Sequence, residues 1–286
     1  MHELRLADLR GAARRRRGVV TPLRLLTLNL QHGLPAVGSP RNGQPASAEI
    51  LREAAGEVAA VGADVVLLQE VDRNQARSGR ADQAALLADA LGLRAHRFAA
   101  ALAGSASGLH VRARRSEARR GFGVALLSRF PVRSWHVLPL RGTGLRLRRG
   151  GDLLGWSLGG WFPAFDESRV CLAAVLRTPD GPLTVAVTHL STIPDVARAQ
   201  LARSAAAVAT LPGPRVLGGD LNLTPGDLAL PGWTALATAR TFSNARPRMQ
   251  LDHLLGAGVA AAGPGRAHHF TISDHAGLSV DVVPAG

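Results

Sequence analysis

Short apolar runs recur along the chain and predict buried β-strands. The runs LRLLTLNL (23–30) and ADVVLLQEV (63–71) are rich in aliphatic residues, and the first ends near Gly33 and Pro35. Further strands are predicted at 121–128, 132–140, 168–176, 182–190, 215–221, 249–255 and 277–283. Runs of this length, bounded by turn residues, are typical of strands rather than of helices.

Three segments instead carry apolar residues at helical spacing. They are 46–61, 81–92, which closes at Gly92, and 194–211, with Asp195 near its amino-terminal cap. The Gly- and Arg-rich stretches 103–120 and 141–166 predict long loops over one edge of the molecule. Strands and helices mixed along the whole chain predict a single domain of packed layers at 21–286, preceded by a basic leader at 1–20.

The composition is that of a globular protein able to bury a core, with 46% hydrophobic and 19% charged residues. A single cysteine, Cys171, excludes an intramolecular disulfide. No apolar stretch approaches the roughly 20 residues of a membrane span. We therefore expect a cytoplasmic monomer.

The net charge of +13 admits a polyanionic partner such as nucleic acid. However, every basic residue apart from histidine is Arg and none is Lys, which indicates a bias in coding composition as much as selection for charge. Part of the charge also lies in the run Arg14 to Arg17, inside the predicted leader. The charge alone therefore does not decide between a nucleic-acid partner and a solvated surface.

Polar residues suited to metal and acid–base chemistry recur at the ends of the predicted strands. They are Asn29, Glu70, His189, Asp220 and Asn222 at strand ends, and Asp274 with His275 before the last strand. A carboxylate that follows VVLLQ is costly to bury alone and needs a partner or a metal. Taken singly, each residue has a structural explanation, such as a turn, a cap or an ion pair. One shared site explains the whole set.

The order of these residues resembles the endonuclease/exonuclease/phosphatase superfamily. The resemblance is carried by TLNLQHG (27–33), LLQEVDR (67–73), GVALLSRFPV (123–132), VTHLS (187–191), GGDLN (218–222), LDHLL (251–255) and SDHAGLSV (273–280). It implies a DNase I-like α/β fold, a four-layer α/β/β/α sandwich in which two mixed β-sheets pack face to face. It also implies a divalent-metal-dependent hydrolase of phosphate esters.

By motif match, the resemblance assigns roles to residues of this chain. Asn29 and Glu70 would hold the cation, Mg²⁺ or in its place Mn²⁺, with Asp274 nearby. His275 would lie close to the scissile phosphate, oriented by Asp252. Asp220 and Asn222 would position the attacking water and a phosphate oxygen, and His189 would donate to the phosphate. Hard cations prefer oxygen ligands, and a carboxylate facing an imidazole stabilises its protonated form, so the chemistry suits these roles.

Two further segments, QHG (31–33) and RSGRADQ (77–83), resemble a bacterial subgroup of the superfamily. This resemblance implies that Arg77, Asp82, Gln83 and Arg169 line the substrate pocket and that His32 is their neighbour. The chain departs from many superfamily nucleases because it contains no Tyr, and the LDHLL block carries His253 where an aromatic residue is frequent.

Three functions stay open at this point. A phosphodiesterase or nuclease draws support from the basic segments 112–120 and 141–150, which could hold a phosphate backbone, although they lack interleaved aromatic residues. The alternative is a phosphatase or phospholipase C-like enzyme for a small or lipid-linked phosphate, with WSLGGWF (156–162) touching a membrane surface. A noncatalytic binding protein is disfavoured because the acidic set is complete.

Overall fold

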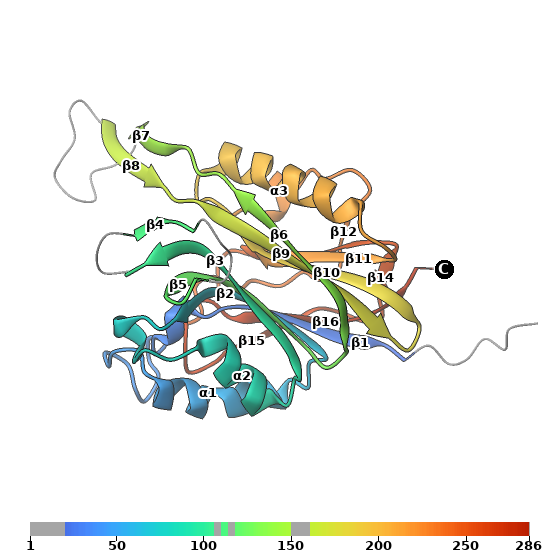
Figure 1. The fold of residues 1–286 in the computed structure, drawn as a ribbon, viewed down its shortest axis with the longest axis horizontal. Helices are drawn as coiled ribbons and strands as arrows, with labels where there is room; N and C mark the ends of the chain where they lie inside the picture. The colour runs from blue at the N-terminus through green and yellow to red at the C-terminus, as the bar shows by residue number, and fades with distance from the viewer. Residues whose placement is uncertain (1–20, 106–109, 114–117, 150–160, 286) are drawn as a thin grey trace, which may run out of the picture.

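The computed structural model describes residues 21–105, 110–113, 118–149 and 161–285, which form two large β-sheets (Figure 1). The first sheet contains β1 (Leu23–Asn29), β2 (Val65–Arg73), β3 (Ala95–Gly104), β4 (His110–Arg112), β5 (Gly121–Ser128), β14 (Val259–Ala261), β15 (Arg266–His268) and β16 (Gly277–Pro284). Its order is β14-β16-β1-β2-β5-β3-β4, with β15 paired to β16. The leader predicted at 1–20 lies outside the described residues.

The second sheet packs against the first. It contains β6 (Val132–Leu140), β9 (Arg169–Thr178), β10 (Gly181–His189), β11 (Arg215–Asp220), β12 (Thr234–Ala235) and β13 (Asp252–Ala257). Its order is β12-β13-β11-β10-β9-β6. Both sheets are mixed, since β1 runs parallel to β2 and β10 parallel to β11 while the other pairs are antiparallel.

Helices cover the outer face of each sheet (Figure 1). The helices α1 (Ala48–Ala60) and α2 (Gln83–Leu91) lie on the first sheet, and α3 (Pro194–Ala209) lies on the second. Side chains cap the first two: Ser47 accepts a hydrogen bond from the Ile50 amide, and Asp82 accepts one from the Ala85 amide. Within the described part of the chain, no helix has both the length and the apolar character needed to cross a bilayer.

Three apolar layers hold these elements together. The central layer lies between the two sheets and includes Leu67, Leu172 and Val187, all fully buried. The other two layers lie between each sheet and its helices, and include Leu51 on the buried face of α1 and Leu201 on the buried face of α3. This confirms the predicted four-layer α/β/β/α sandwich.

The strand directions bring the predicted site residues to one end of the sandwich. His189 ends β10 directly opposite Asp220 at the end of β11, and Asp252 begins the antiparallel β13 opposite Asp220. In the first sheet, Asn29 ends β1 beside Gln69 of β2. The antiparallel β16 begins at the same end, after Asp274 and His275.

The loops predicted at 103–120 and 141–166 contain strands. The structure has β4 in the first stretch, and in the second β7 (Gly144–Arg149) and β8 (Trp161–Asp166), which pair with each other as a separate ribbon. β8 reads WFPAFD and shows no alternation of apolar and polar residues, whereas β7 reads GLRLRR and carries a short alternation of Leu and Arg that indicates a strand. Residues 106–109, 114–117 and 150–160, and with them most of the WSLGGWF segment, lie outside the described residues.

Gly219 lies near the end of β11, paired with Thr188 near the end of the parallel strand β10. Replacing Gly219 should destabilise the fold. Its φ of +137° disfavours other residues, and a Cβ atom there would collide with the carbonyl oxygen of Thr188 on β10. We expect Gly219→Ala to lower the free energy of unfolding by about 3 kcal/mol, measured by urea denaturation. The control is Gly56→Ala in α1, where a Cβ meets nothing within 4 Å and should stabilise by ~0.5–1 kcal/mol. An equally stable Gly219→Ala protein would contradict this account.

Candidate active site

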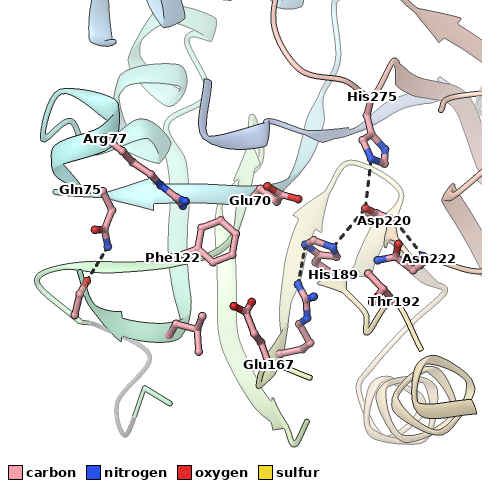
Figure 2. Close-up of a pocket in the computed structure, with 13 residues that line it drawn as sticks. Glu70, Gln75, Arg77, Phe122, Glu167, His189, Thr192, Asp220, Asn222 and His275 are labelled. Atoms are coloured by element: carbon pink, nitrogen blue, oxygen red, sulfur yellow. Dashed lines mark hydrogen bonds and ion pairs between the residues drawn. The ribbon is translucent and has the colours of Figure 1, made fainter. Parts of the chain in front are cut away.

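A cavity of about 320 Å³ opens at this end of the sandwich, between the edges of the two sheets. Its lining consists of Glu70, Gln75, Arg77, Leu102, Gly104, Phe122, Glu167, Arg169, His189, Thr192, Asp220, Asn222 and His275 (Figure 2). The cavity therefore gathers side chains from both sheets and from the loops that follow their strands.

Nitrogen atoms of three side chains approach the Asp220 carboxylate. Its Oδ2 accepts a hydrogen bond from Asn29 Nδ2 at 3.0 Å, and it lies 3.4 Å from His189 Nε2 and 3.7 Å from His275 Nε2. Only 2% of the residue is exposed. Burial and the charge of Asp252 raise the pKa of Asp220 to about 7, although His275 opposes the shift. A carboxylate with this pKa suits a proton acceptor working near neutral pH.

The imidazole of His275 is held between two carboxylates. Its Nδ1 lies 2.8 Å from Asp252 Oδ2, and the Phe242 ring packs against it with 4.9 Å between centroids. Burial lowers the pKa of His275, but the hydrogen bond to Asp252 and the charges of Asp252, Asp220 and Asp274 outweigh it and raise the pKa to about 9. His275 is therefore positively charged near neutral pH, with Nε2 directed at Asp220.

The imidazole of His189 is neutral. Arg169 Nη1 lies 3.2 Å from His189 Nδ1, and because a guanidinium can only donate, this nitrogen must be the acceptor. Burial and the charges of Arg169 and His275 lower the pKa of His189 well below its usual value. The ring proton consequently sits on Nε2, on the side that faces Asp220 and the cavity.

A β-bulge aims Glu70 into the cavity. The register of β2 against β5 shifts between Leu68 and Val71, and Glu70 itself has a φ of +51°. Burial raises the pKa of Glu70, and the charge of Asp274 adds to this rise against the hydrogen bond from Asn29. Within the described residues Glu70 makes no ion pair. The charges of His275 and Arg169 offset this rise in pKa only in part, and two neighbouring carboxylates that repel each other fit a hard divalent cation.

Asn29 joins the two sheets. Its Nδ2 donates to Glu70 Oε1 at 3.2 Å and to Asp220 Oδ2, while its Oδ1 accepts from the Gln31 amide at 2.9 Å. The amide oxygen keeps a second lone pair, so its role as a metal ligand stays a prediction. Asn29 also positions the two carboxylates relative to each other.

Asp220, Asp252 and His275 form a second group that could hold a metal. One potential ligand atom from each lies within 4.8 Å of the others. Asp252 is fully buried, and its Oδ1 has no hydrogen-bond partner within the described residues. The 2.8 Å contact between Asp252 and His275 requires a proton between the two groups, so this group suits proton handling better than metal binding.

The segment that carries Asp274 and His275 is fastened by a residue that the sequence did not indicate. Asn244 is buried, its amide donates to the Asp274 carbonyl at 2.6 Å, and its Nδ2 donates to the carbonyls of Phe270 and Ser273 at 2.9 and 3.1 Å. Ser273 Oγ also donates to the Asn29 carbonyl at 2.6 Å. An asparagine in an irregular segment gives no pattern by which these contacts could be predicted.

A protein-family model described as the endonuclease/exonuclease/phosphatase family matches residues 26–275. The chain belongs to this family. Its members are hydrolases of phosphate esters that depend on divalent metals. The matched region contains Asn29, Glu70, Asp220, Asp252 and His275, the residues that converge at the cavity.

Solved structures show the same fold. An endonuclease/exonuclease/phosphatase from Beutenbergia cavernae matches with a TM-score of 0.64 and 21% identity, over 93% of this chain and 72% of that one. Truncated TDP2 from Caenorhabditis elegans gives 0.57 and 16% over 91% and 97%, and a mannosyl-6-phosphatase from Bacteroides thetaiotaomicron gives 0.57 and 16% over 91% and 99%. No curated protein matches the sequence significantly. At these identities the structural likeness concerns the fold.

In this family member, two of the five residues predicted at the substrate pocket line the cavity and three do not. Arg77 and Arg169 line it. Gln83 is buried behind it, where Oε1 accepts from the Asp72 amide at 2.8 Å and Nε2 donates to the His32 carbonyl at 2.7 Å. His32 also lies outside the lining, so both residues support the wall from behind.

Asp82 and Asn222 serve the architecture around the cavity. Asp82 caps α2 and pairs with Arg73 at 2.8 Å, and it does not line the cavity as the subgroup resemblance implied. Asn222 does line it, in a backbone conformation with a φ of +51°. The Asn222 amide donates to Asp220 Oδ1 at 3.0 Å, and its Nδ2 donates to the Leu190 carbonyl.

Several lining residues escaped the sequence analysis, among them Gln75, Phe122, Glu167 and Thr192. Glu167 carries a usable signal. It lies two residues before the start of β9, which runs antiparallel to β10, so the start of β9 lies at the same edge as His189. Applying the strand-end rule to the starts of antiparallel strands would have found it. Gln75 and Phe122 have no comparable signal.

The pH dependence of stability should report the half-buried His32. Burial and the charge of Arg77 lower the pKa of His32 to about 4, although Asp72 opposes the shift. As the pH falls, His32 is therefore protonated in the unfolded chain before it is protonated in the folded protein. The contribution of neutral His32 to the free energy of unfolding is complete above about pH 6.5 and is lost as the pH falls toward 4.

We expect His32→Asn to lose less free energy of unfolding than the parent protein when the pH falls from 7 to 5. Asn tolerates the φ of +46° at this position. Urea denaturation at both pH values measures the difference. Parallel curves for the two proteins would contradict the assignment, as would an equal change in the control His136→Asn, whose histidine is exposed on β6.

Proposed function

We propose that this family member is a divalent-metal-dependent phosphodiesterase in which Asp220 activates the attacking water. The observation that carries the proposal is the convergence of Asn29, His189 and His275 on Asp220 Oδ2 within one cavity. A buried carboxylate whose pKa is raised to about 7 can take a proton from water at neutral pH. Asp220 as the general base, the charged imidazole of His275 and the neutral donor His189 then face the same cavity.

In this proposal the phosphorus lies in the cavity in front of Asp220. Water oxygen forms the new bond to phosphorus, its proton passes to Asp220, and the ester bond to the leaving oxygen breaks. His189 Nε2–H donates to a non-bridging oxygen, and the His275 cation, oriented by Asp252, places positive charge and a proton near the reacting group. Arg169 keeps the His189 proton on Nε2 and adds positive charge at the same end of the cavity.

Glu70 and Asp274 are the residues that would hold the cation. Their mutual repulsion and the burial of Glu70 are relieved by a divalent ion, and carboxylate oxygens are the ligands that Mg²⁺ and Mn²⁺ prefer. When bound, such an ion supplies positive charge that stabilises the phosphoryl oxygens and the leaving group. We propose Mg²⁺ as this ion.

The size of the cavity favours a phosphodiester with small alcohol groups. A volume of about 320 Å³ is at the lower end for ligand pockets and accepts a group no larger than about one nucleotide. Of the two basic segments proposed to hold nucleic acid, residues 114–117 and 150 lie outside the described part of the chain. Binding to nucleic acid or a membrane surface, a monomeric state and a cytoplasmic location stay predictions from the sequence.

Asp220→Asn should lower hydrolysis by about 10³-fold, the scale of a general base. Because burial and Asp252 already oppose the Asp220 charge, we expect the free energy of unfolding to stay the same or rise. Plasmid DNA, bis(p-nitrophenyl) phosphate and a phosphoinositide panel, each with Mg²⁺, measure activity and locate the substrate class. Asp180→Asn, on the exposed β9–β10 turn, is the matched control. Activity retained by a folded Asp220→Asn protein would contradict the mechanism.

Removing the metal should abolish activity. EDTA treatment is expected to inactivate the enzyme, and Mg²⁺ or Mn²⁺ to restore it. Glu70→Gln should weaken Mn²⁺ binding, measured by calorimetry, by more than the roughly 10-fold to 100-fold cost of losing an outer-shell partner. Glu49→Gln, an exposed carboxylate on α1, should bind Mn²⁺ as the parent does. Turnover in EDTA would contradict the proposed dependence on a metal. Unchanged Mn²⁺ affinity in Glu70→Gln would show that the cation does not bind at Glu70.

A further inference from the structure

The cavity continues beyond the reacting groups to a second end built around an arginine. Arg77, Gln75, Phe122 and Leu102 line this end, and we call these four residues the arginine subsite. Figure 2 shows Arg77, Gln75 and Phe122 on one side of Glu70, with His189, Asp220 and His275 on the other. The proposed reaction uses none of the four residues, so their arrangement needs a separate explanation.

The guanidinium of Arg77 is fixed in one orientation. Its Nε and Nη2 donate to the two carboxylate oxygens of Asp72 at 2.9 and 2.8 Å, and Ser78 Oγ donates to the same carboxylate at 2.9 Å. The guanidinium carbon also lies 5.1 Å from the centre of the Phe122 ring. A donor that is already immobilised loses little freedom when a ligand binds, which favours recognition.

The hydrogen-bonding capacity of Arg77 is not exhausted by these contacts. Its Nη1 makes no hydrogen bond within the described residues. The side chain points toward Phe122 and the interior of the cavity (Figure 2). A ligand at this end therefore meets at least one oriented N–H donor.

The charges around Arg77 select against a second anion on the ligand. Asp72 has no exposed surface and balances the charge of Arg77, so the pair as a whole is neutral. A further phosphate or carboxylate would be attracted only weakly by an arginine whose charge Asp72 already balances, and it would lose its hydration on entering the cavity. An uncharged oxygen, such as a hydroxyl, needs only the donor.

The remaining walls and the volume restrict the ligand further. Phe122 and Leu102 offer apolar surface beside the Arg77 donor, while the Gln75 amide is turned to the Gly104 carbonyl at 2.8 Å, so the ligand meets C–H-binding surface next to one polar donor. The cavity, about 320 Å³, leaves room for only a small group beside the phosphate. A small ring or short chain that bears hydroxyl groups satisfies these conditions.

We propose that the arginine subsite binds the alcohol part of the substrate and that this part is a small uncharged polyol. Arg77 and Phe122 are then the specificity-determining residues, and the buried Asp72 is the positioning residue that fixes Arg77. The proposal rests on the proposed function for the phosphate chemistry, and it adds the class of alcohol whose ester is cleaved.

Three diesters test the proposal, and the two inositol esters among them differ only in one phosphate. Bis(p-nitrophenyl) phosphate has no hydroxyl groups, glycerophosphoinositol has uncharged hydroxyl-rich alcohols, and glycerophosphoinositol 4-phosphate adds one anion to the same alcohol. We expect the wild type to prefer glycerophosphoinositol to its 4-phosphate by about tenfold or more in kcat/KM, because the second phosphate loses hydration beside an arginine that Asp72 already neutralises.

The informative variant is Arg77→Lys, which keeps a cation for the buried Asp72 but loses the planar fork and the Nη1 donor. It should raise KM for glycerophosphoinositol about tenfold, the cost of one hydrogen bond from a charged donor, and should change the value for bis(p-nitrophenyl) phosphate much less. Arg24→Lys is the matched control, since Arg24 makes the same two-bond contact with Asp281 near the start of β1, away from the cavity. Phe122→Leu should likewise raise KM for glycerophosphoinositol and change KM for bis(p-nitrophenyl) phosphate much less.

Two results would overturn the inference. One is a preference of the wild type for the 4-phosphate, and the other is an equal effect of Arg77→Lys on all three esters, as a purely structural ion pair would give. Calorimetric binding of the two inositol esters to Asp220→Asn gives the same comparison without turnover. A wild type that cleaves none of the three esters would contradict the proposed function, while the binding data would still decide for or against the polyol subsite.

Discussion

The hydrogen bond from Asn29 Nδ2 to Asp220 Oδ2 connects the ends of the two sheets at the site, and the rest of the site depends on it. An ionised carboxylate with only 2% exposure is costly unless donors surround it. Asn29 supplies one donor from the first sheet, and the Asn222 amide supplies another from the second. Because Asn29 also donates to Glu70, the same side chain sets the general base and the proposed metal carboxylate at a fixed separation. The packing of the sheets thereby becomes the geometry of the active site.

This geometry requires backbone conformations that most residues avoid. Glu70, Asn222 and Ser273 all have positive φ, with values of +51°, +51° and +71°. Each is in or beside the site: Glu70 in the bulge of β2, Asn222 after β11, and Ser273 before His275. Such conformations persist only where surrounding contacts fix them. Here the Asn244 and Ser273 hydrogen bonds hold the segment before β16, so part of the folding free energy is used to direct side chains into the cavity.

The sequence predicts the edge of the sheets where the site lies more reliably than the directions of individual side chains. Asp220 and His189 were predictable because each ends an apolar run, and parallel strands end at the same edge. The engagement of the Asn29 oxygen by Gln31 was not predictable, because it depends on a local turn. Similarly, β3 reads AHRFAAALAG, and alanines carry little strand preference, so its pairing with β5 follows from tertiary packing. Gln83 looked like a pocket residue in a polar motif, yet its polar atoms hold backbone groups.

The division of the cavity into two ends explains how one scaffold can serve different esters. The reacting end is built by strand termini, whose positions are fixed by both sheets and cannot shift without disturbing the core. In the arginine subsite, Arg77 and Gln75 come from the segment that follows β2, and Asp72 near the end of β2 and Ser78 complete a local network around Arg77. In the proposal, changes in that network alter which group is recognised while leaving Asp220 and His275 in place. Because β2 carries Glu70 and leads directly into this segment, the bulge at Glu70 is the point where the proposed reacting end meets the proposed recognition end.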